Sequence, residues 1–188
     1  MSFLISARRW YRQGETLKTS TLHTARSRRS SAPSANPSRW SARLPVAGLA
    51  AIGLGIASSL AAYQLGFVRQ VWEPFFGDGS RRVLHSFVST LLPVPDAAVG
   101  AAGYAAEFIA TLGGGADRSR VHPPFVLVYG AIVASLAVGG LILTGVQAFV
   151  LHAGCTLCLL SALISVVVAA VARKEVVASL RLMRKESS

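Results

Sequence analysis

Long apolar segments alternate with short polar ones along most of the chain. Two of the apolar segments contain 25 and 28 residues without a charge, and a third contains 18. A helix needs about 20 apolar residues to cross the hydrocarbon core of a bilayer. A further segment has only 16 residues and contains Glu107, but its place between the others favours a short membrane helix. The pattern therefore predicts an all-α integral membrane protein, a bundle of four transmembrane helices over residues 44–68, 97–112, 124–151 and 155–172.

The polar loop between the first two segments contains a weaker helical pattern. Within residues 81–92, apolar residues recur at the spacing of one helix face: Val83, Leu84, Phe87, Val88 and Leu91. Glycines precede this stretch and prolines follow it, as expected at the ends of a helix. We predict a short amphipathic helix in this loop, lying over the bundle or on the membrane interface.

Basic segments flank the apolar region. Residues 1–43 contain nine Lys and Arg residues but only one acid, Glu15, and they have no sustained apolar periodicity. Such a segment buries too little apolar surface to fold alone. We predict a basic, mostly disordered cytoplasmic tail at 1–43, a membrane domain at 44–172 and a basic cytoplasmic C-terminal tail at 173–188. Two alternatives for residues 1–43 are attachment to anionic lipid or nucleic acid, and an organelle transit peptide.

Composition supports a membrane protein and changes how the charge is interpreted. The chain is 52% hydrophobic and 14% charged, with a mean hydropathy of +0.50, whereas about a quarter of a soluble domain is charged. These values disfavour a water-soluble globule and exclude a wholly disordered chain. In a soluble protein, a net charge of +11 would suggest nucleic acid binding.

The distribution of the basic residues explains the charge without a nucleic acid partner. If both termini lie on one side of the membrane, that side has sixteen of the 19 Lys and Arg residues, and the other has only Arg69, Arg81 and Arg82. The positive-inside rule assigns the basic side to the cytoplasm. We therefore predict a multi-pass protein of the bacterial inner membrane, with an organelle membrane as the alternative.

The two cysteines form a C-x-x-C motif, Cys155 and Cys158, at the start of the last apolar segment on the predicted periplasmic side. Residues three apart share a helix face, and the N-terminus of a helix stabilises a thiolate. Disulfides persist in an oxidising compartment. The motif indicates a redox-active dithiol–disulfide pair at the membrane surface.

Other uses of the two cysteines are possible. They could be small buried hydrophobic residues, or bind zinc together with His152 and, as a fourth ligand, His85. Covalent haem attachment needs a His where Leu159 stands. We expect no bound metal.

Two stretches resemble the bacterial homologues of vitamin K epoxide reductase. Residues 147–162, Gln-Ala-Phe-Val-Leu-His-Ala-Gly-Cys-Thr-Leu-Cys-Leu-Leu-Ser-Ala, are similar to the start of the last helix in that family. The second stretch, residues 72–80 followed by 93–104, has the corresponding outward loop and start of the second helix. The likeness extends over residues 44–172.

The resemblance implies a fold, a cofactor and roles for single residues. It implies a four-helix bundle around a quinone, with Cys158 facing the quinone and Cys155 exchanging with the thiol of a partner. Asp96 stands where the vertebrate enzyme has an Asn that binds the quinone carbonyl, and Gly100 and Tyr104 follow at the same offsets. A proton on Asp96 would let it donate to that carbonyl; the alternative is that Asp96 merely caps its helix.

The sequence departs from the family in the outward loop. The family usually has a second cysteine pair there that relays electrons to the C-x-x-C, but this chain has only two cysteines. Trp72 occupies the position of the nearer loop cysteine, and Ala162 replaces a Tyr of the vertebrate enzyme. An intramolecular relay is therefore excluded.

We hypothesise a membrane thiol–disulfide oxidoreductase that couples Cys155 and Cys158 to a quinone. It would oxidise the thiols of an external thioredoxin-like protein; its other partners are quinone and membrane lipid, with no nucleic acid. The alternative is a non-catalytic membrane scaffold or partner subunit on the same fold. Glu107 is either part of a proton route for quinone reduction or an interfacial carboxylate near Arg118.

Overall fold

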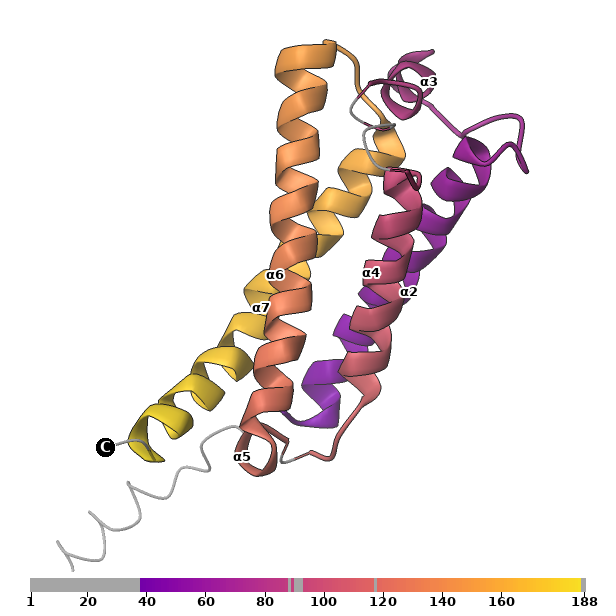
Figure 1. The fold of residues 1–188 in the computed structure, drawn as a ribbon. Coiled ribbons are helices and arrows are strands. Elements are labelled where there is room, and N and C mark those ends of the chain that lie inside the picture. Colours follow the sequence, from indigo (N-terminus) through magenta and orange to yellow (C-terminus); the bar gives the residue numbers. More distant parts are fainter. Residues whose placement is uncertain (1–37, 88, 90–92, 117, 187–188) are drawn as a thin grey trace, which may run out of the picture. The chain divides into compact units, whose positions relative to one another are not determined.

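The computed structural model describes residues 38–87, 89, 93–116 and 118–186 (Figure 1). The predicted tail at 1–43 therefore lies outside the described residues, except for its last six. The described residues are helical and contain no strand. Their elements are α2 (Trp40–Gln64), α3 (Gly79–Leu84), α4 (Asp96–Leu112), α5 (Arg118–Val121), α6 (Pro123–Val146), the π-helix η1 (Gln147–Leu151) and α7 (Thr156–Glu186).

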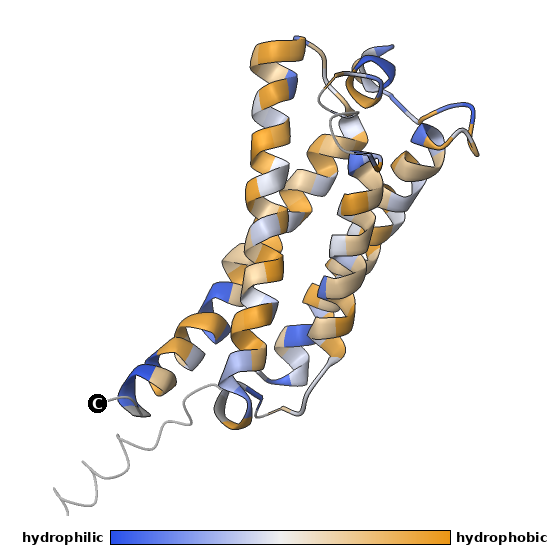
Figure 2. Cartoon of the chain, in the orientation of Figure 1, coloured by the Kyte–Doolittle hydropathy of each residue, from blue (hydrophilic) through white to orange (hydrophobic). Residues whose placement is uncertain are grey.

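Three helices in the described part of the chain are long and apolar enough to cross a membrane. They cover Trp40–Gln64, Pro123–Leu151 and Thr156–Lys185. Figure 2 shows hydrophobic residues along these helices, with hydrophilic ones at α3 and near the end of α7. Three of the four predicted spans are thus confirmed as helices that could span. The fourth, α4, is a helix of 17 residues, and its crossing of the membrane stays a prediction.

The long helices pack as two neighbouring pairs, α2 with α4 and α6 with α7, and α2 also contacts α7 (Figure 1). Small residues allow the close approaches. The ring of Tyr104 in α4 lies directly against Gly53 in α2, and Gly140 in α6 faces Ala162 in α7. Small residues at helix contacts are typical of membrane bundles, where close backbone packing replaces the hydrophobic effect.

Two helices extend beyond their predicted limits. α2 begins at Trp40, so Arg43 lies in its first turns and is buried. α7 continues through residues 173–186, part of the region that we expected to be a basic tail. The reason is visible in two buried side chains of this extension, Glu175 and Ser179, which contact α5.

The loop helix is shorter than predicted. α3 has six residues; its Val83 and Leu84 are buried, while Arg81 and Arg82 point to solvent. Residues 88 and 90–92 of the predicted helix lie outside the described residues, so the longer amphipathic helix at 81–92 is not confirmed.

Buried arginines close the end of the bundle at which α4 ends and α5 begins. Arg118 forms a two-pronged ion pair with Glu175, at 2.7 and 2.9 Å, and also donates to the carbonyl of Ala110. Arg43 donates to the carbonyls of Thr111, at 2.8 Å, and Gly114, at 3.1 Å. Both guanidinium groups thus satisfy carbonyls that the end of a helix leaves unpaired.

Glu107 does not form the contact that we had considered for it. Arg118 is paired with Glu175, whereas Glu107 is completely buried within α4. Neither carboxylate oxygen of Glu107 has a hydrogen-bond partner in the described part of the structure. It is therefore a buried polar group without a hydrogen bond among the described residues, and its position relative to the membrane interface stays a prediction.

Candidate active site

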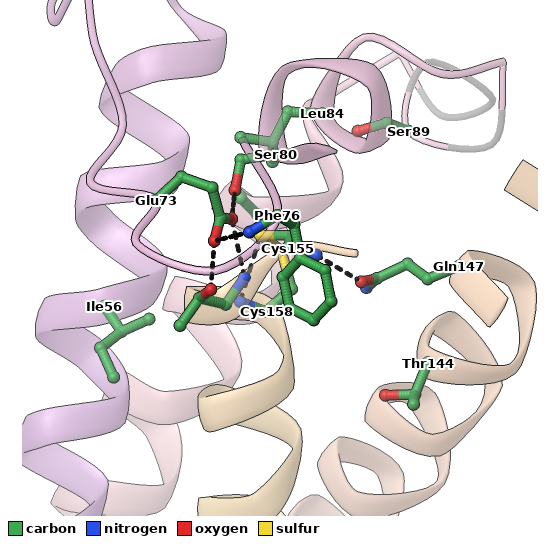
Figure 3. Close-up of a disulfide and its surroundings, with 12 residues drawn as sticks. Ile56, Glu73, Phe76, Ser80, Leu84, Ser89, Thr144, Gln147, Cys155 and Cys158 are labelled. Atoms are coloured by element: carbon green, nitrogen blue, oxygen red, sulfur yellow. Dashed lines mark hydrogen bonds between the residues drawn. A yellow bond between two sulfur atoms is a disulfide. The ribbon is translucent and has the colours of Figure 1, made fainter. Parts of the chain in front are cut away.

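The two cysteines form a disulfide at the beginning of α7 (Figure 3). Their Cα atoms are 5.2 Å apart. Cys155 immediately precedes the helix, and its carbonyl accepts the first helical hydrogen bond, from Leu159 at 3.0 Å. Its sulfur accepts the amide of Cys158 at 3.2 Å. Cys155 thus occupies the N-cap position, where a side-chain acceptor normally satisfies an amide of the first turn.

The turn before the disulfide is held by Gln147. The side-chain oxygen of Gln147 accepts the amide of Cys155 at 3.1 Å, and its backbone carbonyl accepts the amide of Ala153 at 3.2 Å. Between Gln147 and Ala153, the backbone of His152 is left-handed, with a φ of 46°. The widened turn of η1 brings Gln147 into position for both bonds. Zinc ligation by His152 and the cysteines is not the state seen here, because both sulfurs are in the disulfide.

The two cysteines differ in exposure. Cys155 is completely buried in an apolar cluster with Leu60, Val83 and Leu84, while Cys158 is half-buried at its edge. The cluster combines residues of α2 and α3 with the segment that leads into α7. The sulfur that the resemblance assigns to exchange with a partner is therefore the more enclosed of the two.

A carboxylate from the loop between α2 and α3 contacts the start of α7. Glu73 accepts the amide of Thr156 at 2.9 Å, and also the hydroxyls of Thr156 and Ser80 (Figure 3). Burial raises the pKa of Glu73, but the hydrogen bonds from Ser80 and Thr156 outweigh it and lower the pKa from an ordinary 4.5 to about 2. A fixed negative charge thus lies beside the N-terminus of the helix that carries the disulfide.

Asp96 lies in a polar cluster at the start of α4. Its Oδ1 accepts the side-chain amide of Gln64 at 2.6 Å, the hydroxyl of Ser89 at 2.6 Å and the amide of Ala97 at 2.9 Å. Ala97 packs against the apolar cluster that contains Cys155. The structure thus brings Asp96 to the same end of the bundle as the cysteines, with its oxygen engaged as an acceptor.

Gly100 and Tyr104 follow Asp96 along one face of α4, because residues four apart are neighbours on a helix. Tyr104 is buried, and its hydroxyl donates to the carbonyl of Ser161 at 2.6 Å and lies 2.7 Å from the hydroxyl of Ser165. Ser161 is one helical turn beyond Cys158. The three residues therefore form a line that starts at the disulfide cluster and runs into the bundle.

Sequence reasoning missed Glu73, Gln147 and Gln64. Each is a polar residue that contacts the site through its side chain from a different element. The only signal available for Glu73 was its position in the loop stretch similar to the family, and Gln147 was quoted only as the first residue of the other stretch.

A sequence model described as the vitamin K epoxide reductase family matches residues 44–173, which is more than half of the chain. The matched region contains the disulfide, Glu73, Gln147 and the Asp96 cluster. No curated protein matches the sequence.

Proposed function

Since the chain belongs to the vitamin K epoxide reductase family, we propose that it is a membrane thiol–disulfide oxidoreductase that couples the Cys155–Cys158 disulfide to a quinone. Its electron donor is the dithiol of an external thioredoxin-like protein. The observation that carries the proposal is the disulfide at the N-terminus of α7, set against the helix that bears Asp96 and Tyr104. A dithiol–disulfide pair in this position can both accept electrons and pass them on.

The residues around the disulfide fit a quinone headgroup, which is apolar with two polar carbonyls. Apolar side chains of Ile56, Leu60 and Leu157 lie around the sulfurs. Hydrogen-bonding groups stand at the edge of this apolar set: the Gln64 amide, Asp96 and, one turn past Cys158, the Tyr104 hydroxyl. Asp96, Gly100 and Tyr104 would hold the quinone, which supplies an acceptor for two electrons and two protons when it is bound.

The chain's own chemistry is thiol–disulfide exchange. A partner thiolate attacks the sulfur of Cys155, the Cys155–Cys158 bond breaks, and Cys158 leaves as a thiolate. The second partner thiol then attacks the mixed disulfide, which releases Cys155 and oxidises the partner. The first turn of α7 stabilises the Cys158 thiolate, because the helix N-terminus favours negative charge. When the pair gives up two electrons and two protons, the disulfide forms again.

A quinone-reduction assay tests the function directly. Purified protein in detergent receives dithiothreitol as the dithiol and a short-chain benzoquinone or naphthoquinone, and the ultraviolet absorbance of the quinone is followed. We expect turnover by the wild type and only background rates from Cys155→Ala and Cys158→Ala. Equal rates from the wild type and Cys158→Ala would contradict the proposal.

The proposed location is the bacterial inner membrane, with both termini in the cytoplasm and the disulfide on the periplasmic side. The distribution of Lys and Arg supports this orientation. A membrane-impermeant maleimide should label the reduced cysteines from outside the inner membrane, in spheroplasts. Labelling only in inverted membrane vesicles would show the opposite orientation.

A non-catalytic scaffold on the same fold is the second candidate, and one observation favours it: the chain has no cysteines besides the C-x-x-C pair. The redox state of that pair in intact membranes separates the two functions. In an enzyme the proportion of disulfide follows the supply of oxidised quinone, whereas in a scaffold it stays constant.

A further inference from the structure

The proposed exchange reaction meets an obstacle in this structure, since Cys155 is completely buried. Thiol–disulfide exchange requires the attacking thiolate to reach the sulfur. The loop that precedes α3, together with α3 itself, provides the cover. Residues 72–80, called the loop below, comprise the segment before α3 and the first two residues of that helix, and they contact the start of α7.

The backbone of the loop approaches the disulfide segment closely. Gly79 lies against the carbonyl of Gly154, so closely that a side chain at Gly79 would collide with it. In turn, a Cβ atom at Gly154 would lie 2.6 Å from ring carbons of Phe76. These contacts place the loop directly over the residue before Cys155. Much of the remaining loop surface faces solvent, with Trp72 and Phe75 66% and 77% exposed.

Glu73 forms the polar connection between the loop and α7. On the loop side, its carboxylate accepts the Ser80 hydroxyl and the amides of Phe75 and Phe76, at 3.4 and 3.3 Å. On the α7 side, it accepts the amide of Thr156 at 2.9 Å and the Thr156 hydroxyl. Figure 3 shows the carboxylate between the two segments, next to the disulfide. One side chain therefore shapes the loop and fastens it to the residue that follows Cys155.

We propose that Glu73 is a positioning residue that latches the loop over Cys155, so that release of its bonds to Thr156 limits the access of thiols to this cysteine. The proposal rests on the proposed function, in which Cys155 is the sulfur attacked. With the latch closed, thiols reach Cys155 only when the loop opens transiently, so small thiols react slowly. A partner that binds the open loop would speed the exchange.

The test measures access to Cys155 without any quinone. In a Cys158→Ala background, Cys155 is the only thiol, and its alkylation by a small maleimide is followed by mass spectrometry over a range of pH. Removing a nearby carboxylate also lowers the pKa of a thiol, which moves the midpoint of the pH profile. Opening the loop instead raises the plateau rate at high pH, where the thiol is fully ionised.

We expect Glu73→Ala to raise the plateau rate about tenfold, the change expected in an opening equilibrium when one charge-assisted hydrogen bond is lost. Asp78→Asn is the matched control. It removes a carboxylate from the same loop, but that side chain is exposed and makes no capping hydrogen bond to α3. Its plateau should equal that of the parent.

A plateau unchanged by Glu73→Ala, with or without a shift of the midpoint, would overturn the latch. If Glu73→Ala does not insert and fold, Thr156→Val and Ser80→Ala each remove one hydroxyl donor to Glu73, and a raised plateau is expected from both. Because the assay contains no quinone, its failure leaves the proposed function standing. Loss of quinone turnover in the separate assay does not affect the latch.

Discussion

At the scale of single residues, the disulfide segment is held by polar side chains from distant parts of the sequence. Glu73 binds the residue after Cys155, and Gln147 binds the amide of Cys155 itself. Both bonds use groups at a helix start that have no partner within the helix. Replacing either side chain therefore leaves an amide beside the disulfide without its acceptor.

The first prediction concerns the acid stability of the Glu73 contacts. The pKa of Glu73 is about 2 in the folded protein and ordinarily 4.5. The folded state therefore gains stability from ionised Glu73 above pH 4.5 and loses it as the pH falls towards 2. In detergent, the difference in Tm between the wild type and Glu73→Gln should be constant from pH 5 to 8 and shrink below that range. A difference that grows on acidification would contradict this assignment.

The second prediction concerns Glu107, a fully buried carboxyl whose oxygens have no partner among the described residues. Burial of a polar group without a hydrogen bond costs about 1–3 kcal/mol. We expect Glu107→Met to raise the free energy of unfolding by about that amount. Glu175→Met is the matched control with the opposite sign, because Glu175 is paired with Arg118.

Quinone turnover of a Glu107→Gln variant separates a functional role from a structural cost. The glutamine amide keeps the shape of the side chain, but unlike a carboxyl group it cannot take up and release a proton. Unchanged turnover would show that Glu107 has no part in proton transfer.

A physical difference explains why the disulfide could be predicted from the sequence, whereas the side chains that hold its segment in place could not. A C-x-x-C at the start of an apolar segment places both cysteines at a helix N-terminus and on one face of that helix. Both properties depend only on residues that are close together in the sequence. By contrast, Glu73 and Thr156 are 83 positions apart. Only the folded bundle brings them together, and nothing in the residues near Glu73 specifies that contact.

At the scale of elements, hydrophobicity located the helices well and their ends poorly. The charge of Arg43 suggested that the first helix begins after it. Arg43 nevertheless lies inside α2, because carbonyls at and just after the end of α4 accept hydrogen bonds from its guanidinium group. Similarly, α7 continues past Arg173 and Lys174 because Glu175 and Ser179 face α5. Buried hydrogen bonds thus extended both helices into sequence that looks polar.

The third prediction tests the packing of α2 against α4. A Cβ atom at Gly53 would lie within 2.7 Å of ring carbons of Tyr104. We expect Gly53→Ala to destabilise the protein by about 1–3 kcal/mol, the usual cost of overpacking. Gly55→Ala is the control on the same helix, where a Cβ atom meets nothing within 4 Å. Thermal unfolding of both variants in detergent measures the difference, and equal Tm values would refute the contact.

At the scale of the whole helical unit, residues 38–186, the two ends of the bundle have different roles. One end carries the disulfide under the loop that Glu73 fastens. The other joins α2, α4, α5 and α7 through Arg43, Arg118 and Glu175. Sequence reasoning identified the first end through its cysteines. It treated the basic residues of the second end as a guide to topology and Arg118 as a neighbour of Glu107, and it did not predict the ion pair with Glu175.

The fourth prediction concerns the second end. Arg118 is 1% exposed and carries both prongs of the ion pair with Glu175. Removal of one partner of a buried pair costs about 3–5 kcal/mol, because the other charge stays buried and unpaired. We expect Arg118→Ala to lower the free energy of unfolding by about that amount. Arg173→Ala, on the exposed face of α7, should change it by less than about 0.5 kcal/mol.

The π-helical turn at Gln147–Leu151 makes the disulfide sensitive to the number of residues before it. A π-helical turn contains one residue more than an α-helical turn. Deleting Phe149, whose side chain is 82% exposed, would permit a regular α-helix and remove few side-chain contacts within the bundle. It would also rotate the following residues by about 100°. Cys155 would then lose the hydrogen bond from its amide to the Gln147 side chain and its place in the apolar cluster. Insertions and deletions should therefore be tolerated less at this turn than substitutions of its exposed side chains.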